Sequence, residues 1–250
     1  MLSATVRRVY RYCRGDGSLT IAVGIMVLFV FVLYPMAEMG VAPRIWLDIG
    51  FGLSLAFGAY FVFEPRPLMR LFILFLLGTV ALRAVEFFVD DHWLTTFGMI
   101  FALLACLFFA ALLLVRAMRD GHINVNRIVG AVGAYLLIGI TFGIAYRLLA
   151  LYVDHAFAMG GTPVDYAQVQ ARLPYFSFVT LTATGYGDIT PWHPYARSLA
   201  TLEALFGGLF LTVLVARLVG LEMEWREEQR EWRAQQKAAA DAETKQDASP

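Results

Sequence analysis

Long apolar runs decide what this chain can fold into. Six stretches are each apolar over roughly 20 residues, the length that a helix needs to cross a hydrocarbon layer about 30 Å thick. They cover about residues 19–41, 45–63, 68–89, 93–116, 128–153 and 196–221. Hydrophobic residues make up 59% of the 250 positions and charged residues 16%, too few charges to cover a soluble domain of this length. The sequence therefore predicts an all-α transmembrane protein with six spanning helices.

Charged residues between the apolar runs predict the orientation of the chain. Basic residues gather before the first run, between the second and third, between the fourth and fifth, and after the sixth: Arg7, Arg8, Arg11, Arg14, Arg66, Arg70, Arg116, Arg119, Arg127, Arg226, Arg230, Arg233 and Lys237. The loops on the opposite side hold Asp90, Asp91, Asp154 and Asp165, with few basic residues. Because cytoplasmic segments carry the excess of Arg and Lys, both termini are expected in the cytoplasm. The first run carries Pro35 and Glu38 and is too long for a signal peptide, so it is expected to remain as a helix.

The runs and their flanks divide the chain into four parts. These are a cytoplasmic segment (1–18), a four-helix membrane unit (19–119), a unit with the last two helices (120–221), and a polar tail (222–250) that is expected to be partly helical and then disordered. The net charge of zero gives no basic field for nucleic acid. Cys13 and Cys106 form no disulfide framework, and no loop carries a catalytic arrangement or a metal-ligand cluster, so neither an enzyme nor a cofactor is expected.

The segment between the last two runs is apolar but too short to span a membrane. It reads PYFSFVTLTATGYGDITP, from Pro174 to Pro191. Proline suits the first turn of a helix, and Gly185 and Gly187 would end that helix. Alternating glycines permit backbone angles closed to other residues, so that successive carbonyls can face one axis. Because non-helical backbone at membrane depth occurs only where protein buries it or where it lines a watery path, we expect a re-entrant pore helix followed by such a strand.

The sequence TLTATGYGD, which ends at Asp188, resembles the selectivity-filter signature of the potassium channel superfamily, whose usual core is T-V-G-Y-G. The resemblance covers about residues 127–220, with a six-helix layout similar to small bacterial members. It implies a potassium-selective channel of the plasma membrane, the inner membrane of a bacterium, with K⁺ as the permeant ion and lipid as its surroundings. It also implies a homotetramer with cyclic symmetry. The filter would be Thr182, Ala183, Thr184, Gly185, Tyr186 and Gly187, with K⁺ bound by the carbonyl oxygens of Ala183, Thr184, Gly185 and Tyr186.

This filter departs from the family pattern at two neighbouring positions. Ala183 stands where relatives have threonine, and Thr184 stands where they have Val, Ile or Leu. The innermost ion site is therefore expected to keep its carbonyls and to lose its hydroxyl ligands. A nonselective cation channel of the same fold is the alternative that these departures leave open. A secondary transporter and a non-conducting membrane scaffold are rivals from other classes, but a transporter would need paired broken helices, and only one interrupted segment is present.

Residues beside the filter are expected to support it. The resemblance implies that Tyr186 points away from the axis and packs against Tyr175 and Phe176. Some relatives pair a pore-helix glutamate with the filter aspartate, but Val179 occupies that position here, so Asp188 lacks that partner.

The last helix carries candidate gating residues. Gly207 lies twenty positions after Gly187, where many relatives have a hinge glycine, and Gly208 follows it. As a hinge, Gly207 would lower open probability when changed to alanine and leave selectivity unaltered; the alternative is a small residue that lets two helices approach closely. Three further residues recur at helical spacing and would narrow a gate or form a packing stripe: Leu211, Val215 and Val219.

Two charges fall inside predicted spans. Arg147 and Glu203 lie at similar depths from the outer ends of the fifth and sixth helices, so we expect an ion pair behind the filter; the alternative is that Arg147 reaches outward alone.

The fourth run has no basic residue before Arg116, so steep voltage dependence is not expected. The tail has no soluble ligand-binding motif. Its seven-residue spacing of Leu218, Trp225 and Trp232 fits either a short coiled coil or tryptophans at the membrane interface.

Overall fold

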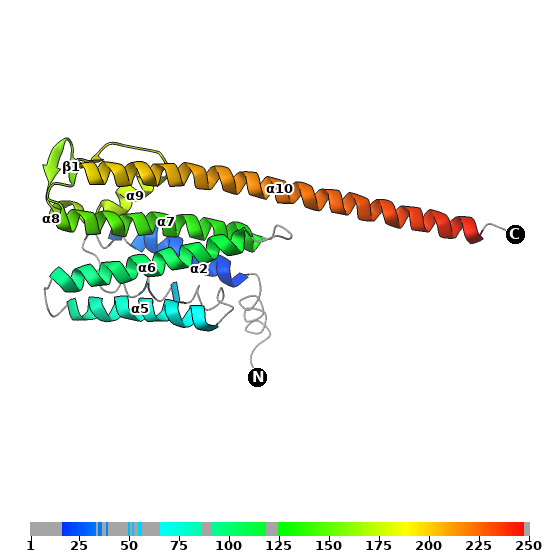
Figure 1. Ribbon diagram of the computed structural model, residues 1–250, viewed down its shortest axis with the longest axis horizontal. Helices are drawn as coiled ribbons and strands as arrows, with labels where there is room; N and C mark the ends of the chain where they lie inside the picture. The colour runs from blue at the N-terminus through cyan, green and yellow to red at the C-terminus, as the bar shows by residue number, and fades with distance from the viewer. Residues whose placement is uncertain are drawn as a thin grey trace.

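The computed structural model describes residues 17–33, 35–36, 39, 50, 52, 55–56, 66–86, 92–118 and 125–247. Within these ranges, long helices lie side by side along one axis and a small sheet closes one end (Figure 1). The elements in chain order are α2 (Gly17–Leu28), the π-helical η1 (Phe29–Leu33), α5 (Arg66–Glu86), α6 (His92–Ala117), α7 (Val125–Tyr152), β1 (Phe157–Met159), β2 (Thr162–Val164), α8 (Tyr166–Val169), α9 (Leu173–Leu181), β3 (Ile189–Pro191) and α10 (Pro194–Asp247).

Three of the described helices are long and apolar enough to cross a membrane. They are residues 92–115 of α6, 128–152 of α7 and 194–217 of α10, with mean hydropathies of 2.8, 2.1 and 2.0. Two shorter apolar helices cover Leu19–Leu33 and Arg70–Leu82. The predicted second span, about residues 45–63, falls almost wholly outside the described residues, as do most of residues 1–18. A mostly helical membrane protein is thus confirmed, and the count of six spans stays a prediction.

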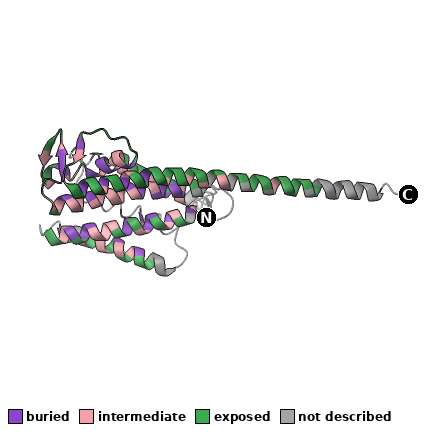
Figure 2. Cartoon of the chain, turned by 45° about the horizontal axis from the view of Figure 1, so that its top comes forward, coloured by how far each residue is buried: buried purple, intermediate pink, exposed green. Residues whose placement is uncertain are grey.

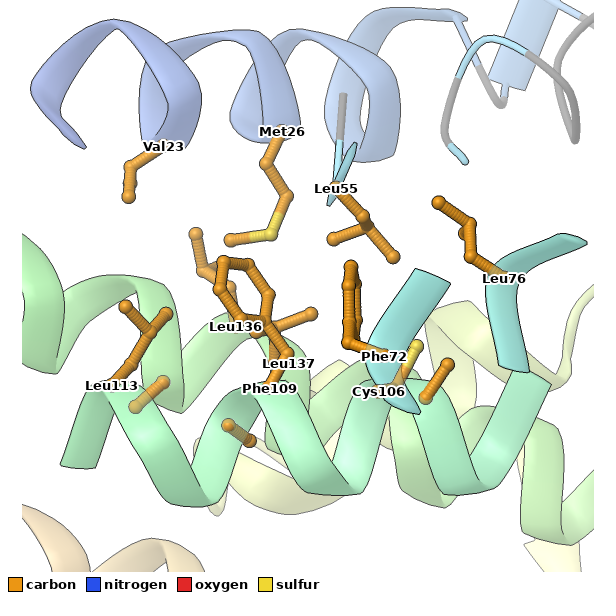
Figure 3. Close-up of a cluster of buried hydrophobic side chains, with 13 residues drawn as sticks. Val23, Met26, Leu55, Phe72, Leu76, Cys106, Phe109, Leu113, Leu136 and Leu137 are labelled. Atoms are coloured by element: carbon orange, nitrogen blue, oxygen red, sulfur yellow. The ribbon is translucent and has the colours of Figure 1, made fainter. Parts of the chain in front are cut away.

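One buried cluster joins the N-terminal helices to α7. Figure 3 shows side chains of α2, α5, α6 and α7 pointing toward one another, with Leu55 among them. Phe72 of α5 and Leu137 of α7 are fully buried, and the ring of Phe72 lies 5.3 Å from that of Phe109. Cys106 is a buried free thiol in the same cluster. These buried side chains pack the N-terminal helices closely against α7.

A second cluster lies under the sheet at the end of α7. The rings of Tyr146, Phe157 and Phe176 meet edge to face, with centroids 5.0 to 5.7 Å apart, the geometry that aromatic quadrupoles favour. The sheet has the order β2-β1-β3, and both pairings are antiparallel. Gly160 and Gly161 connect β1 to β2 with φ of 56° and 81°, angles that a two-residue hairpin turn requires. This sheet was not among the predicted elements.

Helix α10 is a single helix from Pro194 to Asp247, and it projects far beyond the other helices (Figure 1). The end of the tail was predicted to be disordered from its polar composition; the structure describes a helix there as far as Asp247. Ala, Glu, Gln, Lys and Arg, which fill this stretch, are strong helix formers. Most of α10 is exposed (Figure 2), and only 17% of its apolar span is buried, against 39% in α6 and 44% in α7. The surroundings of α10 therefore come mainly from outside its own chain.

Candidate functional site

Helix α9 is the short helix that the sequence predicted after Pro174, and its C-terminal end is fully hydrogen-bonded. Pro174 lies in the first turn and Thr182 is the C-cap residue. A helix leaves its last four carbonyls without helical partners, yet all four accept a hydrogen bond here. The donors are the amides of Thr182 to Phe178, Thr184 to Val179 and Ala183 to Thr180, and the hydroxyl of Tyr135 to Leu181. The end of α9 is thereby fixed in position.

The chain after α9 has an alternating backbone conformation. Residues at every second position lie in the left-handed region: Ala183 with φ of 55°, Gly185 with 60° and Gly187 with 78°. Glycine adopts such angles freely, whereas alanine does so at a cost of about 1–2 kcal/mol. A change of hand at each residue turns successive peptide planes, and Gly185 and Gly187 have the glycine-permitted angles that the sequence predicted. The non-glycine member, Ala183, was not predicted to share them.

Close contacts show that α9 runs antiparallel to α7. Tyr135 meets Leu181, an added Cβ atom at Gly139 would lie 2.7 Å from the Phe178 ring, and one at Gly143 would lie 3.1 Å from Pro174. Residue numbers therefore rise along one helix as they fall along the other. The two glycines, four residues apart, form the small-residue face that lets membrane helices approach.

Helix α10 runs parallel to α9 where the two helices meet. Ser177 contacts Glu203, and four residues later on both helices Leu181 contacts Gly207. An added Cβ atom at Gly207 would lie 2.0 Å from the Leu181 carbonyl oxygen, so no side chain fits there. The structure thus supports the close-approach alternative for Gly207. The hinge role of Gly207 stays a prediction, since α10 is helical through this point. Its neighbour Gly208 is exposed, and no atom lies within 4 Å of a Cβ atom added there.

Glu203 is fully buried and has hydroxyl partners. The Tyr146 hydroxyl donates to its Oε2 atom at 2.5 Å, and Ser177 Oγ lies 2.5 Å from its Oε1 atom. The described contacts of this carboxyl therefore replace the predicted pair with Arg147. The reason is helical geometry: Arg147 follows Tyr146 and lies about 100° around α7 from it. Arg147 lines a different space, a cavity of about 690 Å³ between α9 and the N-terminal helices, which Arg172 also lines.

The residues after α9 face away from the rest of the chain. All residues from Thr182 to Asp188 are exposed, and the side chain of Tyr186 is 71% exposed. Phe176, predicted to pack against Tyr186, is instead buried against Tyr146 and Phe157. Successive residues of a helix point in different directions, so Tyr175 and Phe176 do not share a face.

Tyr175 lies beside Asp188. Loss of hydration, a hydrogen bond to the Asp188 carboxylate and the charge of that carboxylate raise the pKa of Tyr175. A phenol, whose ordinary pKa is about 10, is protonated at neutral pH and can therefore donate to a carboxylate. Asp188 lacks the glutamate partner found in relatives but has a tyrosine one turn closer to the start of α9. The sequence named Tyr175 as a supporting residue without identifying this partner.

Both ends of the exposed segment are anchored. At its start, the Thr182 hydroxyl donates to the Phe178 carbonyl at 2.7 Å and lies 2.8 Å from the Thr184 hydroxyl. At its end, the Gly160 amide donates to the Asp188 carbonyl at 3.2 Å, and β3 continues into the sheet. Sequence reasoning missed the hairpin that supplies this anchor, although the pair Gly160–Gly161 between two short apolar segments is a hairpin signal.

The candidate gate residues lie on the exposed part of α10. Leu211, Val215 and Val219 are all exposed, so they do not form a packing stripe against the described part of their own chain. Their surroundings are a cavity, another copy of the chain, or lipid.

Comparison with known proteins adds one finding. A family model described as "ion channel" matches residues 172–223, which begin just before α9, include the left-handed segment and β3, and end within α10. No curated protein and no solved structure matches the chain significantly. The match gives residues 172–223 a likeness to an ion channel, and α6, α7 and α10 each contain a stretch long and apolar enough to cross a membrane.

Proposed function

We propose that this chain is one subunit of a homotetrameric potassium channel, with Thr182–Gly187 as its selectivity filter. The observation that carries the proposal is the backbone of that segment, in which Ala183, Gly185 and Gly187 are left-handed and the residues between them are not. Peptide planes arranged in this way can direct successive carbonyl oxygens to one side. Such oxygens replace the water around a dehydrated K⁺ ion. The oxygens assigned to K⁺ are those of Ala183, Thr184, Gly185 and Tyr186.

The exposure of the same segment supports a tetramer. A lone strand of carbonyls surrounds no ion, and Tyr186 has most of its ring uncovered within one chain. In a closed cyclic tetramer, each copy covers the exposed filter segment of the next copy, and four strands of carbonyls enclose one axis. The largely exposed apolar part of α10 is the surface that such an assembly needs. Residues 211, 215 and 219 would then line the path below the filter.

We further propose passive conduction with little voltage dependence. Helix α6 occupies the place of the fourth span and carries no basic residue before Arg116. Each charge moved through the membrane potential contributes about 2.3 kcal/mol per 100 mV, so a steep response needs several such residues. The proposed location is the plasma membrane, with multiple spans and both termini in the cytoplasm, as the distribution of basic residues indicates.

The test is ion flux into liposomes that contain only the purified protein. A K⁺ gradient is expected to drive flux without a coupled ion, and reversal potentials under K⁺–Na⁺ gradients are expected to follow K⁺. Gly185→Ala is expected to reduce flux, because a side chain at φ of 60° strains the filter backbone by about 1–2 kcal/mol in every subunit. Gly208→Ala, in open space on α10, is the control. Equal permeation of Na⁺ and K⁺ would favour the second candidate, a nonselective cation channel, which the Ala183–Thr184 pair motivates. Flux that depends on a coupled gradient would refute both channel proposals.

A further inference from the structure

Glu203 is the one fully buried carboxyl group among the described residues, and it lies where three helices meet. It belongs to α10, Tyr146 to α7 and Ser177 to α9. Ser177 Oγ lies 2.5 Å from the Glu203 carboxyl and 2.6 Å from the backbone carbonyl oxygen of Gly139 on α7. The serine oxygen is therefore within hydrogen-bond distance of two oxygen acceptors at once.

The number of protons decides the state of this cluster. A serine hydroxyl has one hydrogen to donate, and an ionised carboxylate can only accept. If Glu203 were ionised, Ser177 could donate to Glu203 or to Gly139, and the other contact would bring two acceptor oxygens together with no proton between them. A protonated Glu203 removes the conflict. The acid donates to Ser177, Ser177 donates to the Gly139 carbonyl, and Tyr146 donates to the second carboxyl oxygen, so that three protons serve three contacts.

The surroundings agree with a neutral acid. The groups that face Glu203 from the helices packed on it are the hydroxyls of Tyr146 and Ser177, with Tyr135 further along α7, and no cation is among its described contacts. A buried carboxylate without a cation or several N–H donors is unfavourable, whereas a hydrogen-bonded carboxylic acid is not.

We infer that Glu203 is an uncharged carboxylic acid and acts as a positioning residue, which holds α9, and through it the filter, against α7 and α10. The Glu203–Ser177 contact and the Gly207–Leu181 contact lie one turn apart on the same pair of helices, so together they fix both the distance and the rotation of α9. The effect on conduction rests on the proposed function; the protonation state does not.

The experiment compares two replacements of similar size. In Glu203→Gln, an amide N–H replaces the acid O–H as donor to Ser177 and the amide oxygen still accepts from Tyr146. In Glu203→Met, both partners lose their hydrogen bond. We expect the glutamine variant to keep the tetramer and a melting temperature within about 3 °C of the native value, and the methionine variant to lose more than about 5 °C. In liposomes, the glutamine variant is expected to retain K⁺ selectivity and the methionine variant to lose it.

A spectroscopic readout separates protonation from simple packing. The infrared difference spectrum of native protein minus Glu203→Gln at neutral pH is expected to show the carbonyl stretch of a protonated carboxylic acid, shifted by Ser177→Ala because that hydroxyl is its partner. Carboxylate bands in that spectrum, or a glutamine variant as unstable as the methionine one, would overturn the inference. The melting temperatures and the infrared spectrum need only folded protein, so their results do not depend on whether the channel conducts K⁺.

Discussion

Gly207 has no space for a side chain, because the carbonyl oxygen of Leu181 stands where a Cβ atom would lie. The same oxygen accepts the hydroxyl of Tyr135 from the other side of α9. One carbonyl at the entrance to the filter segment thus touches both neighbouring helices. A glycine that the sequence associates with bending of α10 also contacts the end of α9.

Gly207→Ala is expected to displace the end of α9 and to break the Tyr135–Leu181 bond, with loss of K⁺ selectivity or of the tetramer. Overpacking against backbone costs about 1–3 kcal/mol or more, which exceeds the roughly 1 kcal/mol that alanine adds to a helix. Reversal potentials and native-gel analysis measure the two effects. Gly208→Ala is the matched control and is expected to be neutral or slightly stabilising. A Gly207→Ala channel with reduced open probability and native selectivity would support the hinge in place of the packing role.

Ala183 has a left-handed backbone and stands where the filter signature that the sequence resembles has threonine. Ala183→Ser adds a hydroxyl to the innermost ion site without a branched Cβ atom, which left-handed angles disfavour strongly. We expect tighter block by Ba²⁺ from the cytoplasmic side, since each subunit adds one oxygen ligand. Ala183→Gly, which relaxes the backbone and adds no ligand, is the control for a general loosening of the filter. Block that is the same in both variants would show that no oxygen ligand is missing from this site.

At the scale of the elements, the sequence predicted those parts whose signals are local. Pro174 at the start of α9 and the apolar stretches of α6, α7 and α10 each follow from a few adjacent residues. The glycines that were predicted to end α9 come too late to do so, because the helix stops at Leu181 and Ala183, not a glycine, is the first left-handed residue after it. The hairpin of β1 and β2 also had a local signal at Gly160–Gly161, but strands of three residues are too short for periodicity to identify. Polar composition fits a solvated helix as well as a disordered chain, and in the end of the tail the structure describes a helix as far as Asp247.

Contacts between elements were predicted less well, since they depend on helix rotation. Equal depth suggested that Arg147 and Glu203 meet, yet a shift of one residue on α7 brings Tyr146 to the carboxyl instead. In the same way, Tyr175 approaches Asp188 while its neighbour Phe176 turns into the aromatic cluster. Depth along a helix follows from counting residues; the direction of a side chain follows only from how the helices pack.

At the scale of the whole molecule, the part of α10 beyond its membrane-length apolar stretch carries exposed tryptophans. Trp225 and Trp232 lie seven residues apart and are exposed on one chain, 38% and 55% respectively. The double change Trp225→Ala and Trp232→Ala is expected to weaken the tetramer about tenfold, because exposed tryptophans that become buried between subunits contribute strongly to association. Native mass spectrometry of the detergent-solubilised protein measures the change.

The matched control is Glu227→Ala with Arg230→Ala, which removes side chains of the same helix between the two tryptophans and is expected to leave the tetramer intact. Tryptophans at a membrane interface would give a different result: strong fluorescence quenching of both by brominated lipids and no change in subunit association. That result would favour the lipid-facing alternative for this part of α10.

The uninterrupted course of α10 also has a mechanical consequence. From residue 218 to Asp247 it extends for about 45 Å at 1.5 Å per residue, with no break in helical structure between the stretch that packs on α9 and its last turn. Rotation or tilt applied near the far end is therefore transmitted along a stiff rod to the face that carries Glu203 and Gly207. In the proposed channel, a partner bound to this part of α10 would move the end of α9, and with it the filter segment, without contacting either directly.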